Sequence, residues 1–204
     1  MLIPLLFILG GYLCGSVLFA RLAVDLFGKG SIVTDSKDAN PGAANAFQYG
    51  GLWCCMLVLC GDLAKGFLPI HFLLAWPGAL DLSPLLLAPA LAAPVIGHTF
   101  PLFYRFQGGK GIAVTFGCLL GLLPMWEPVG FFALVFVFFS VILRISPHFY
   151  RTLVTYLVTL VLLIFSCPLA IWGGFLLLSC AVLLRFHLSK EERGRVAVNV
   201  LWRS

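Results

Sequence analysis

The chain has 204 residues, of which 61% are hydrophobic and only 10% are charged, and its formal net charge is +5. A soluble domain of this length would carry roughly 25% charged residues. Together with a mean hydropathy of +1.06, this excludes a water-soluble globular protein, because so few polar side chains cannot cover a solvent-facing surface. We therefore expect membrane lipid as a partner and no nucleic acid.

Seven apolar stretches follow one another along the chain. They cover about 2–24, 51–75, 84–97, 112–125, 129–143, 152–167 and 168–186. A helix needs roughly 20 residues to cross the hydrocarbon core, so the sequence predicts an all-α integral membrane protein of about seven transmembrane helices. Residues 1–204 are expected to form one membrane-embedded domain. The N-terminus lacks the positive region of a cleavable signal peptide, so we expect the first stretch to be retained.

The basic residues indicate an orientation. Lys or Arg occurs in the loops after the first, third and fifth stretches and in the tail after the seventh. The other three loops contain only Asp81 and Glu127 as charged residues. Since cytoplasmic loops carry an excess of Lys and Arg, the pattern predicts an outside N-terminus and a cytoplasmic C-terminus. A model with six spans would break this alternation.

The cysteines and histidines indicate neither disulfides nor a metal site. The cysteines lie in or beside apolar runs and form no CxxC pair, which favours small buried side chains over disulfides. The four histidines show no spacing typical of metal ligands. The seven cysteines are Cys14, Cys54, Cys55, Cys60, Cys118, Cys167 and Cys180.

Asp62 and Lys65 are charged residues within the second apolar stretch. Residues three apart lie on one face of a helix, so these two side chains can pair. Charged groups at membrane depth usually face the bundle interior and often mark a functional site. An ion pair can equally hold helices together, and the sequence leaves both roles open.

Two loops contain candidate site residues. In the first, Asn40-Pro41-Gly42 is a strong turn signal followed by small residues. Asn40 and Asn45 are expected either to bind substrate or to brace the loop. An ordinary turn between helices is the alternative interpretation.

The second loop places Gly108, Gly109 and Gly111 around Lys110, directly before an apolar helix. Glycine-rich backbone, a helix N-terminus and a lysine together suit an anion such as phosphate. The loop is not a Walker A motif, because Tyr104 and Gly111 stand where that motif needs Gly and Ser or Thr. A basic turn beside the membrane is the alternative.

Four clusters in the right order resemble the bacterial acyl-phosphate-dependent glycerol-3-phosphate acyltransferases, the PlsY family. They are Tyr12-Leu13-Cys14-Gly15-Ser16; Asn40-Pro41-Gly42-Ala43 with Asn45; Asp62-Leu63-Ala64-Lys65-Gly66; and Gly97-His98 with Pro101, Phe106, Gly108-Gly109-Lys110-Gly111-Ile112-Ala113 and Phe116-Gly117.

The resemblance implies transfer of an acyl group from acyl phosphate to the 1-hydroxyl of glycerol 3-phosphate, giving lysophosphatidic acid for phospholipid biosynthesis. It implies a multi-pass protein of the bacterial inner membrane with its site at the cytoplasmic face. No cofactor, metal or covalent intermediate is needed, because the mixed anhydride is already activated. The protein's task is to position the substrates and stabilise charge. The expected catalytic residues are Lys110 and His187, and His98 joins the asparagines and glycines in substrate binding.

The chain departs from the family motifs at polar positions. Asp38 stands at a family serine, Gln48 at a family arginine and Phe186 at a family histidine. His187 takes the histidine's place only if the register shifts by one residue, which is about 100° on a helix. Loss of an arginine–phosphate contact removes on the order of 1.5–3 kcal/mol per charged hydrogen bond.

Three interpretations remain. In the first, the chain is a divergent but active acyltransferase whose phosphate site is rebuilt by nearby cations; the candidates are Lys37, Arg144, Arg151 and Arg185. In the second, the chain is a family relative that is non-catalytic or has a changed acceptor. In the third, it is a small transporter or lipid-binding protein, although no clear internal repeat supports transport.

Overall fold

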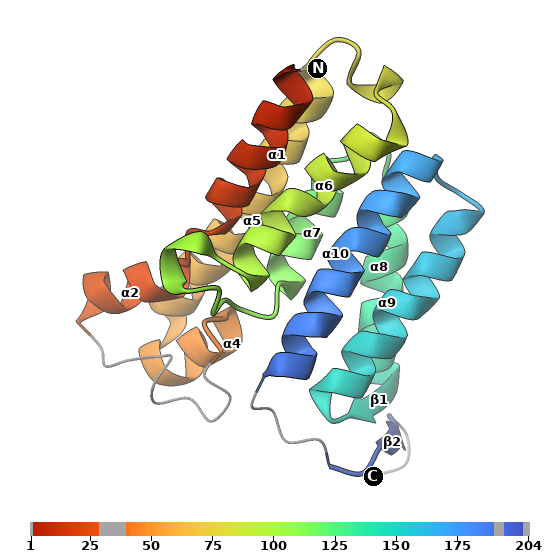
Figure 1. Cartoon of the computed structure of the whole chain (residues 1–204). Coiled ribbons are helices and arrows are strands. Elements are labelled where there is room, and N and C mark those ends of the chain that lie inside the picture. Colours follow the sequence, from red (N-terminus) through yellow and green to blue (C-terminus); the bar gives the residue numbers. More distant parts are fainter. Residues whose placement is uncertain (1, 29–39, 190–193, 202–204) are drawn as a thin grey trace.

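The computed structural model describes residues 2–28, 40–189 and 194–201, and these residues are mostly helical (Figure 1). Four segments are long and apolar enough to cross a membrane: Leu2–Phe27, Leu52–Ala75, Pro84–Tyr104 and Leu169–Leu188. The shorter apolar helices Glu127–Ile142 and His148–Ile164 accompany them. The prediction of a helical membrane protein is therefore confirmed at this level.

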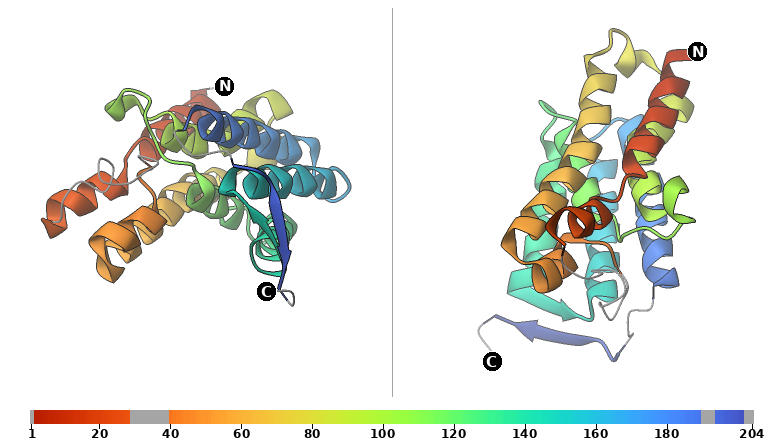
Figure 2. Two further views of the ribbon diagram at one scale, coloured as in Figure 1. Left: turned by 90° about the horizontal axis from the view of Figure 1, so that it is seen from below. Right: turned by 90° about the vertical axis from the view of Figure 1, so that its left-hand side faces the viewer.

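The long helices pack in two layers. They are α1 (Leu2–Gly15), α5 (Leu52–Ala75), α6 (Pro84–Thr99), α7 (Ile112–Leu120), α8 (Glu127–Val137), α9 (His148–Ile164) and α10 (Leu169–Leu188). In the first layer, α6 lies between α1 and α10, whereas α5 packs on α7 in the second (Figure 2). Helices α8 and α9 pack on each other, and α9 also contacts α10.

The first apolar stretch is not one helix, which corrects the prediction of a single span over 2–24. Helix α1 ends at Gly15, and α2 (Phe19–Phe27) leaves in another direction (Figure 1). At the break, Ser16 Oγ donates to the Tyr12 carbonyl at 2.8 Å and accepts from the Leu102 amide at 3.2 Å. Helix α2 is amphipathic, with Ala20 and Ala23 buried, so it follows the surface of the bundle.

Two short strands correct the all-α prediction. Strand β1 (Leu143–Ser146) pairs antiparallel with β2 (Ala197–Val200), with Leu143 opposite Val200 and Ser146 opposite Ala197. The fifth predicted span, 129–143, therefore ends as the short π-helix η4 (Phe138–Ile142) that leads into β1. Next to the pair, the Leu201 amide donates to the Ile142 carbonyl at 3.1 Å and so satisfies a backbone group at the end of the helix.

The remaining elements are short and belong to the connections. Helix α4 (Ala43–Asn45) continues into the π-helix η1 (Ala46–Gly50) before α5. The 3-10 turns η2 (Ala79–Asp81) and η3 (Leu102–Tyr104) precede and follow α6. The loop with Asn40 precedes α5, and the loop with Lys110 follows α6. Both loops lie at the same end of the bundle.

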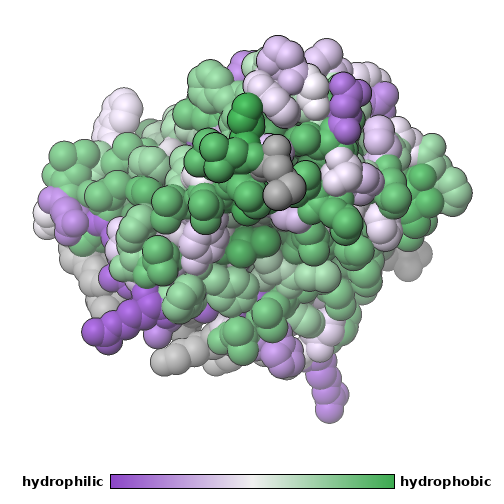
Figure 3. Space-filling view, turned by 45° about the horizontal axis from the view of Figure 1, so that its top comes forward, coloured by the Kyte–Doolittle hydropathy of each residue, from purple (hydrophilic) through white to green (hydrophobic). Residues whose placement is uncertain are grey.

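Glycines bring helix backbones into direct contact. A Cβ on Gly66 of α5 would lie 2.4 Å from the Val114 carbonyl oxygen, and one on Gly117 of α7 would lie 2.2 Å from the Leu63 oxygen. Small residues at helix crossings are typical of packing inside membranes. The outer surface is strongly apolar (Figure 3), with Leu134 68% and Leu85 85% exposed. This surface suits lipid contact.

Candidate active site

A cavity of about 400 Å³ lies where α4, the end of α6 and the start of α7 meet α5. Polar groups of both predicted loops line one part of it, whereas Leu59, Phe116 and Phe136 form an apolar part. A larger apolar groove of about 450 Å³ between α1 and α5 has no charged lining residue. The residues that line the polar part of the first cavity include Asn40, Asn45, Asp62, His98, Lys110, Gly111 and His148.

The glycine-rich loop is fixed to the end of α6. The Gly108 amide donates to the Thr99 carbonyl at 3.3 Å, and the Gly109 amide donates to the His98 carbonyl at 3.1 Å. A Cβ on Gly108 would lie 1.8 Å from the His98 carbonyl oxygen. These two amides bond within the protein, so the two glycines serve the site by allowing close approach of the backbone.

Asn40 and Asn45 link the two loops. Asn45 Nδ2 donates to the Asn40 carbonyl at 2.9 Å, and Asn40 Oδ1 accepts from the Lys110 amide at 3.1 Å. The asparagines therefore brace the loops, and both also line the cavity. Three amides of the loop, those of Gly108, Gly109 and Lys110, are engaged inside the protein. Lys110 also lines the cavity, and α7 begins beside it at Ile112 with the positive end of its helix dipole.

Lys110 lies against Phe186. The ammonium Nζ is 4.9 Å from the centroid of the Phe186 ring, a cation–π contact. Phe186 is 1% exposed, so α10 turns residue 186 toward the site. His187 is exposed and does not line the cavity among the described residues. Its predicted catalytic role stays a prediction.

A buried ionic network lies below the loop. The predicted Asp62–Lys65 pair is confirmed, with Lys65 Nζ 2.9 Å from Asp62 Oδ1. The same Nζ donates to the Val17 carbonyl at 2.6 Å and lies 2.8 Å from His98 Nδ1. All three side chains are at most 3% exposed. The sequence indicated the pair by its spacing, but nothing in it linked His98 to Lys65 from 33 positions away.

The three candidate replacement cations that the structure describes are not among the residues that line the cavity. Arg144 is exposed on β1, Arg185 is half-buried on α10, and neither lines the cavity within the described part of the chain. Arg151 contacts His148, which does line it. Gln48, at the family arginine position, is exposed on η1. Lys37 and Asp38 lie outside the described residues.

All seven cysteines are free. Cys54 and Cys118 are buried as expected, but Cys60 and Cys180 are exposed on apolar helices, where we had expected burial. Over residues 2–28, 40–189 and 194–201, no three His, Cys, Asp or Glu side chains gather as a metal site would need.

Known proteins are similar to this chain in sequence and in fold. Residues 5–194 match the family described as glycerol-3-phosphate acyltransferase. A glycerol-3-phosphate acyltransferase of Klebsiella pneumoniae is 32% identical over 202 residues, which cover 96% of this chain and 90% of the relative. One from Pseudoalteromonas translucida is 44% identical over 122 residues, covering 59% of this chain and 56% of the relative.

A solved structure has the same fold. The crystal structure of PlsY (YgiH), an integral membrane glycerol 3-phosphate acyltransferase, in its glycerol 3-phosphate form gives a TM-score of 0.74 at 24% identity. The match covers 90% of this chain and 88% of that chain.

Proposed function

This chain belongs to the glycerol-3-phosphate acyltransferase family, and from that premise we propose that it transfers an acyl group from acyl phosphate to the 1-hydroxyl of glycerol 3-phosphate. The products are lysophosphatidic acid, used in phospholipid biosynthesis, and inorganic phosphate. One observation carries the assignment: a single cavity joins Lys110 to an apolar part formed by Leu59, Phe116 and Phe136. An acyl phosphate has one charged and one apolar end and fits that pairing.

The reaction needs positioning more than activation. The acceptor oxygen attacks the carbonyl carbon, an ester C–O bond forms, and the bond from that carbon to the phosphate oxygen breaks. The hydroxyl proton ends on the released phosphate. Holding the two reactants together in the right geometry supplies much of the acceleration. Lys110 offsets the phosphate charge, and the asparagine braces hold its loop in place.

Phe186 has a part in this arrangement. Its ring holds the Lys110 ammonium at 4.9 Å, so the aromatic side chain at the family histidine position restricts the cation to the cavity side of α10. His187 does not line the cavity. For it to act in catalysis, the protein must move, or another group must connect this side chain to the substrates. We therefore assign the main electrostatic role to Lys110.

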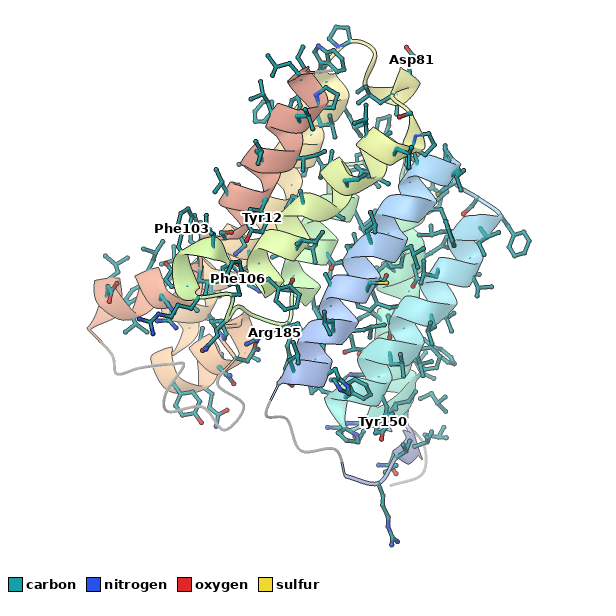
Figure 4. The ribbon with its side chains drawn as sticks, in the orientation of Figure 1. Tyr12, Asp81, Phe103, Phe106, Tyr150 and Arg185 are labelled. Carbon is teal, nitrogen blue, oxygen red and sulfur yellow. The ribbon has the colours of Figure 1, made fainter. Side chains whose placement is uncertain are left out.

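We also propose seven membrane spans, an outside N-terminus and a cytoplasmic C-terminus. Asp81 lies at the opposite end of the bundle from Arg185 (Figure 4). Arg21, Arg105 and Arg144 belong to α2, the loop after η3 and β1, all at the end that holds the cavity. The positive-inside rule then supports a cavity at the cytoplasmic face. There the charged phosphate groups of both substrates are in contact with water.

The test is release of phosphate from palmitoyl phosphate by purified full-length protein, with and without glycerol 3-phosphate. We expect release that depends on the acceptor. Lys110→Ala should reduce it by roughly 10- to 150-fold, the equivalent of about 1.5–3 kcal/mol for a hydrogen bond to a charged group. Arg195→Ala is the matched control, because Arg195 is an exposed cation outside the cavity lining.

The outcomes separate the alternatives. No acceptor-dependent release from folded wild-type protein overturns the proposal and favours a changed acceptor or a non-catalytic relative. Equal release by the wild type and Lys110→Ala would instead remove Lys110 from the site.

A further inference from the structure

The Lys65 ammonium has three neighbours that can accept a hydrogen bond. They are Asp62 Oδ1 at 2.9 Å, the Val17 carbonyl oxygen at 2.6 Å and His98 Nδ1 at 2.8 Å. Helix α5 supplies Lys65 and Asp62, the break between α1 and α2 supplies Val17, and α6 supplies His98. Three separate elements therefore meet at one nitrogen atom.

The protons on Lys65 Nζ decide which nitrogen of the His98 imidazole carries a proton. A lysine ammonium has three N–H donors and no acceptor. Val17 accepts one of these protons, Asp62 forms an ion pair with the ammonium, and His98 Nδ1, 2.8 Å away, must accept another because the ammonium has no acceptor of its own. A neutral imidazole that accepts at Nδ1 carries its own proton on Nε2. His98 is then a hydrogen-bond donor at the nitrogen that faces away from Lys65.

That nitrogen lies against the glycine-rich loop. A Cβ on Gly109 would lie 2.3 Å from His98 Nε2, so the imidazole fills the space that a side chain at position 109 would need. His98 lines the same cavity as Lys110. Among the described residues, the hydrogen bonds and ion contacts of the His98 ring all involve Nδ1. The Nε2–H group is thus left for a ligand at the cavity.

We propose that Lys65 holds His98 in its Nε2–H tautomer and that His98 donates this proton in a hydrogen bond to a phosphoryl oxygen bound beside Gly109 and Lys110. Lys65 is a positioning residue and His98 a ligand-binding residue. The ligand is a phosphate monoester or an acyl phosphate, the charged chemistry that the proposed function requires, and in that respect the inference rests on the proposed function.

The tautomer is measured directly by nitrogen NMR of full-length protein with ¹⁵N-labelled histidine, reconstituted in lipid nanodiscs. The signals of His98 are those lost in His98→Gln. We expect a protonated Nε2 and an unprotonated Nδ1. Lys65→Met should remove this preference. A proton on Nδ1, or on both nitrogens, in the wild type would overturn the proposal even if Lys65→Met does not fold.

The ligand is identified by titrating the same sample separately with inorganic phosphate, glycerol 3-phosphate and a non-hydrolysable acyl phosphonate. The Nε2–H signal should shift with at least one of them, and the compound that shifts it names the bound partner. No shift at concentrations where calorimetry shows binding excludes His98 as a donor. This measurement needs no turnover, so its result is distinct from failure of the proposed function.

Turnover gives a second readout. His98→Leu should raise KM for the compound that shifts the signal by about 10- to 100-fold, as for a lost hydrogen bond to a charged group. His98→Gln, which keeps an N–H donor, should recover part of that loss. His71→Gln, exposed near the opposite end of α5, is the matched control. An unchanged KM in a folded His98→Leu variant contradicts the proposal.

Discussion

Gly109 and His98 show how closely the site is built at the level of single residues. The Gly109 amide bonds to the His98 carbonyl at 3.1 Å while its α-carbon lies against the ring of the same histidine. One glycine thus contacts both the backbone and the side chain of His98. Position 109 has no room for a methyl group.

We predict that Gly109→Ala lowers acceptor-dependent phosphate release at least tenfold. The new Cβ, 2.3 Å from His98 Nε2, must displace the loop or the imidazole, and each tenfold of rate corresponds to about 1.4 kcal/mol. The measurement is kcat/KM in purified protein of verified fold. Gly10→Ala is the control, because a Cβ there meets nothing within 4 Å. Full activity in Gly109→Ala would show that the loop has space to adjust.

The types and spacing of residues in the sequence predicted part of the candidate site but not all of it. The run of glycines around Lys110 and the Asn-Pro-Gly turn indicated both loops, and spacing indicated the Asp62–Lys65 pair. The contact of His98 with Lys65 follows from how α5 packs beside α6, and single-residue patterns do not encode such packing. The same holds for Phe186, whose side chain faces Lys110 only because α10 packs on α6.

The helices are held together by close backbone approach as well as by apolar side chains. Where α5 and α7 cross, Gly66 and Gly117 face each other's helix, and a Cβ on Gly117 would also lie 3.1 Å from the Gly66 α-carbon. Helix α7 begins at the site and α5 carries Lys65. This crossing therefore fixes the distance between the glycine-rich loop and the buried network.

We predict that Gly117→Ala lowers the thermal unfolding midpoint of the protein in detergent and reduces turnover together. The added methyl would lie 2.2 Å from the Leu63 carbonyl oxygen, and overpacking of this kind typically costs about 1–3 kcal/mol. Differential scanning fluorimetry measures the change. Gly173→Ala on α10 is the control, since its Cβ would meet Ala88 Cβ at an ordinary 3.4 Å. Equal midpoints for the two variants would contradict tight packing at this crossing.

At the scale of elements, the apolar stretches of the sequence predicted where the long helices lie but not where they are interrupted. The residues of 2–24 are apolar on both sides of Ser16, so hydropathy could not reveal the break before α2. Strand β1 continues an apolar run, and its partner β2 lies more than 50 residues later. Long-range pairing of that kind has no local signal. The predicted stretch 129–143 therefore matches the helix over Glu127–Ile142 except at Leu143, where β1 begins.

At the scale of the whole molecule, charge and apolar surface are separated. Apolar side chains cover much of the face seen in Figure 3. Asp81 in η2 and Glu127 at the start of α8 lie at one end of the bundle, and the cavity lies toward the other. Composition alone predicted the membrane environment, because no arrangement of so few charges could cover a soluble surface of this size.

We predict that a fluorescent protein fused after Ser204 fluoresces in bacteria and that alkaline phosphatase inserted in the turn at Asp81 is active. The first reporter folds in the cytoplasm and the second outside it, so the pair reads the proposed orientation. Alkaline phosphatase fused after Ser204 should be inactive and is the reciprocal control. An active enzyme there would reverse the orientation and move the cavity to the outer face.

The three contacts of the Lys65 ammonium also bear on how this sequence can evolve. Gln48 is exposed, so a change there leaves no buried group without a partner and that position can vary freely. Replacing Lys65 strands a carboxylate, a carbonyl oxygen and an imidazole nitrogen where all are buried. Even arginine, with its planar fork, does not reproduce three protons on one atom. Exposed positions such as residue 48 can therefore diverge while the buried network stays fixed.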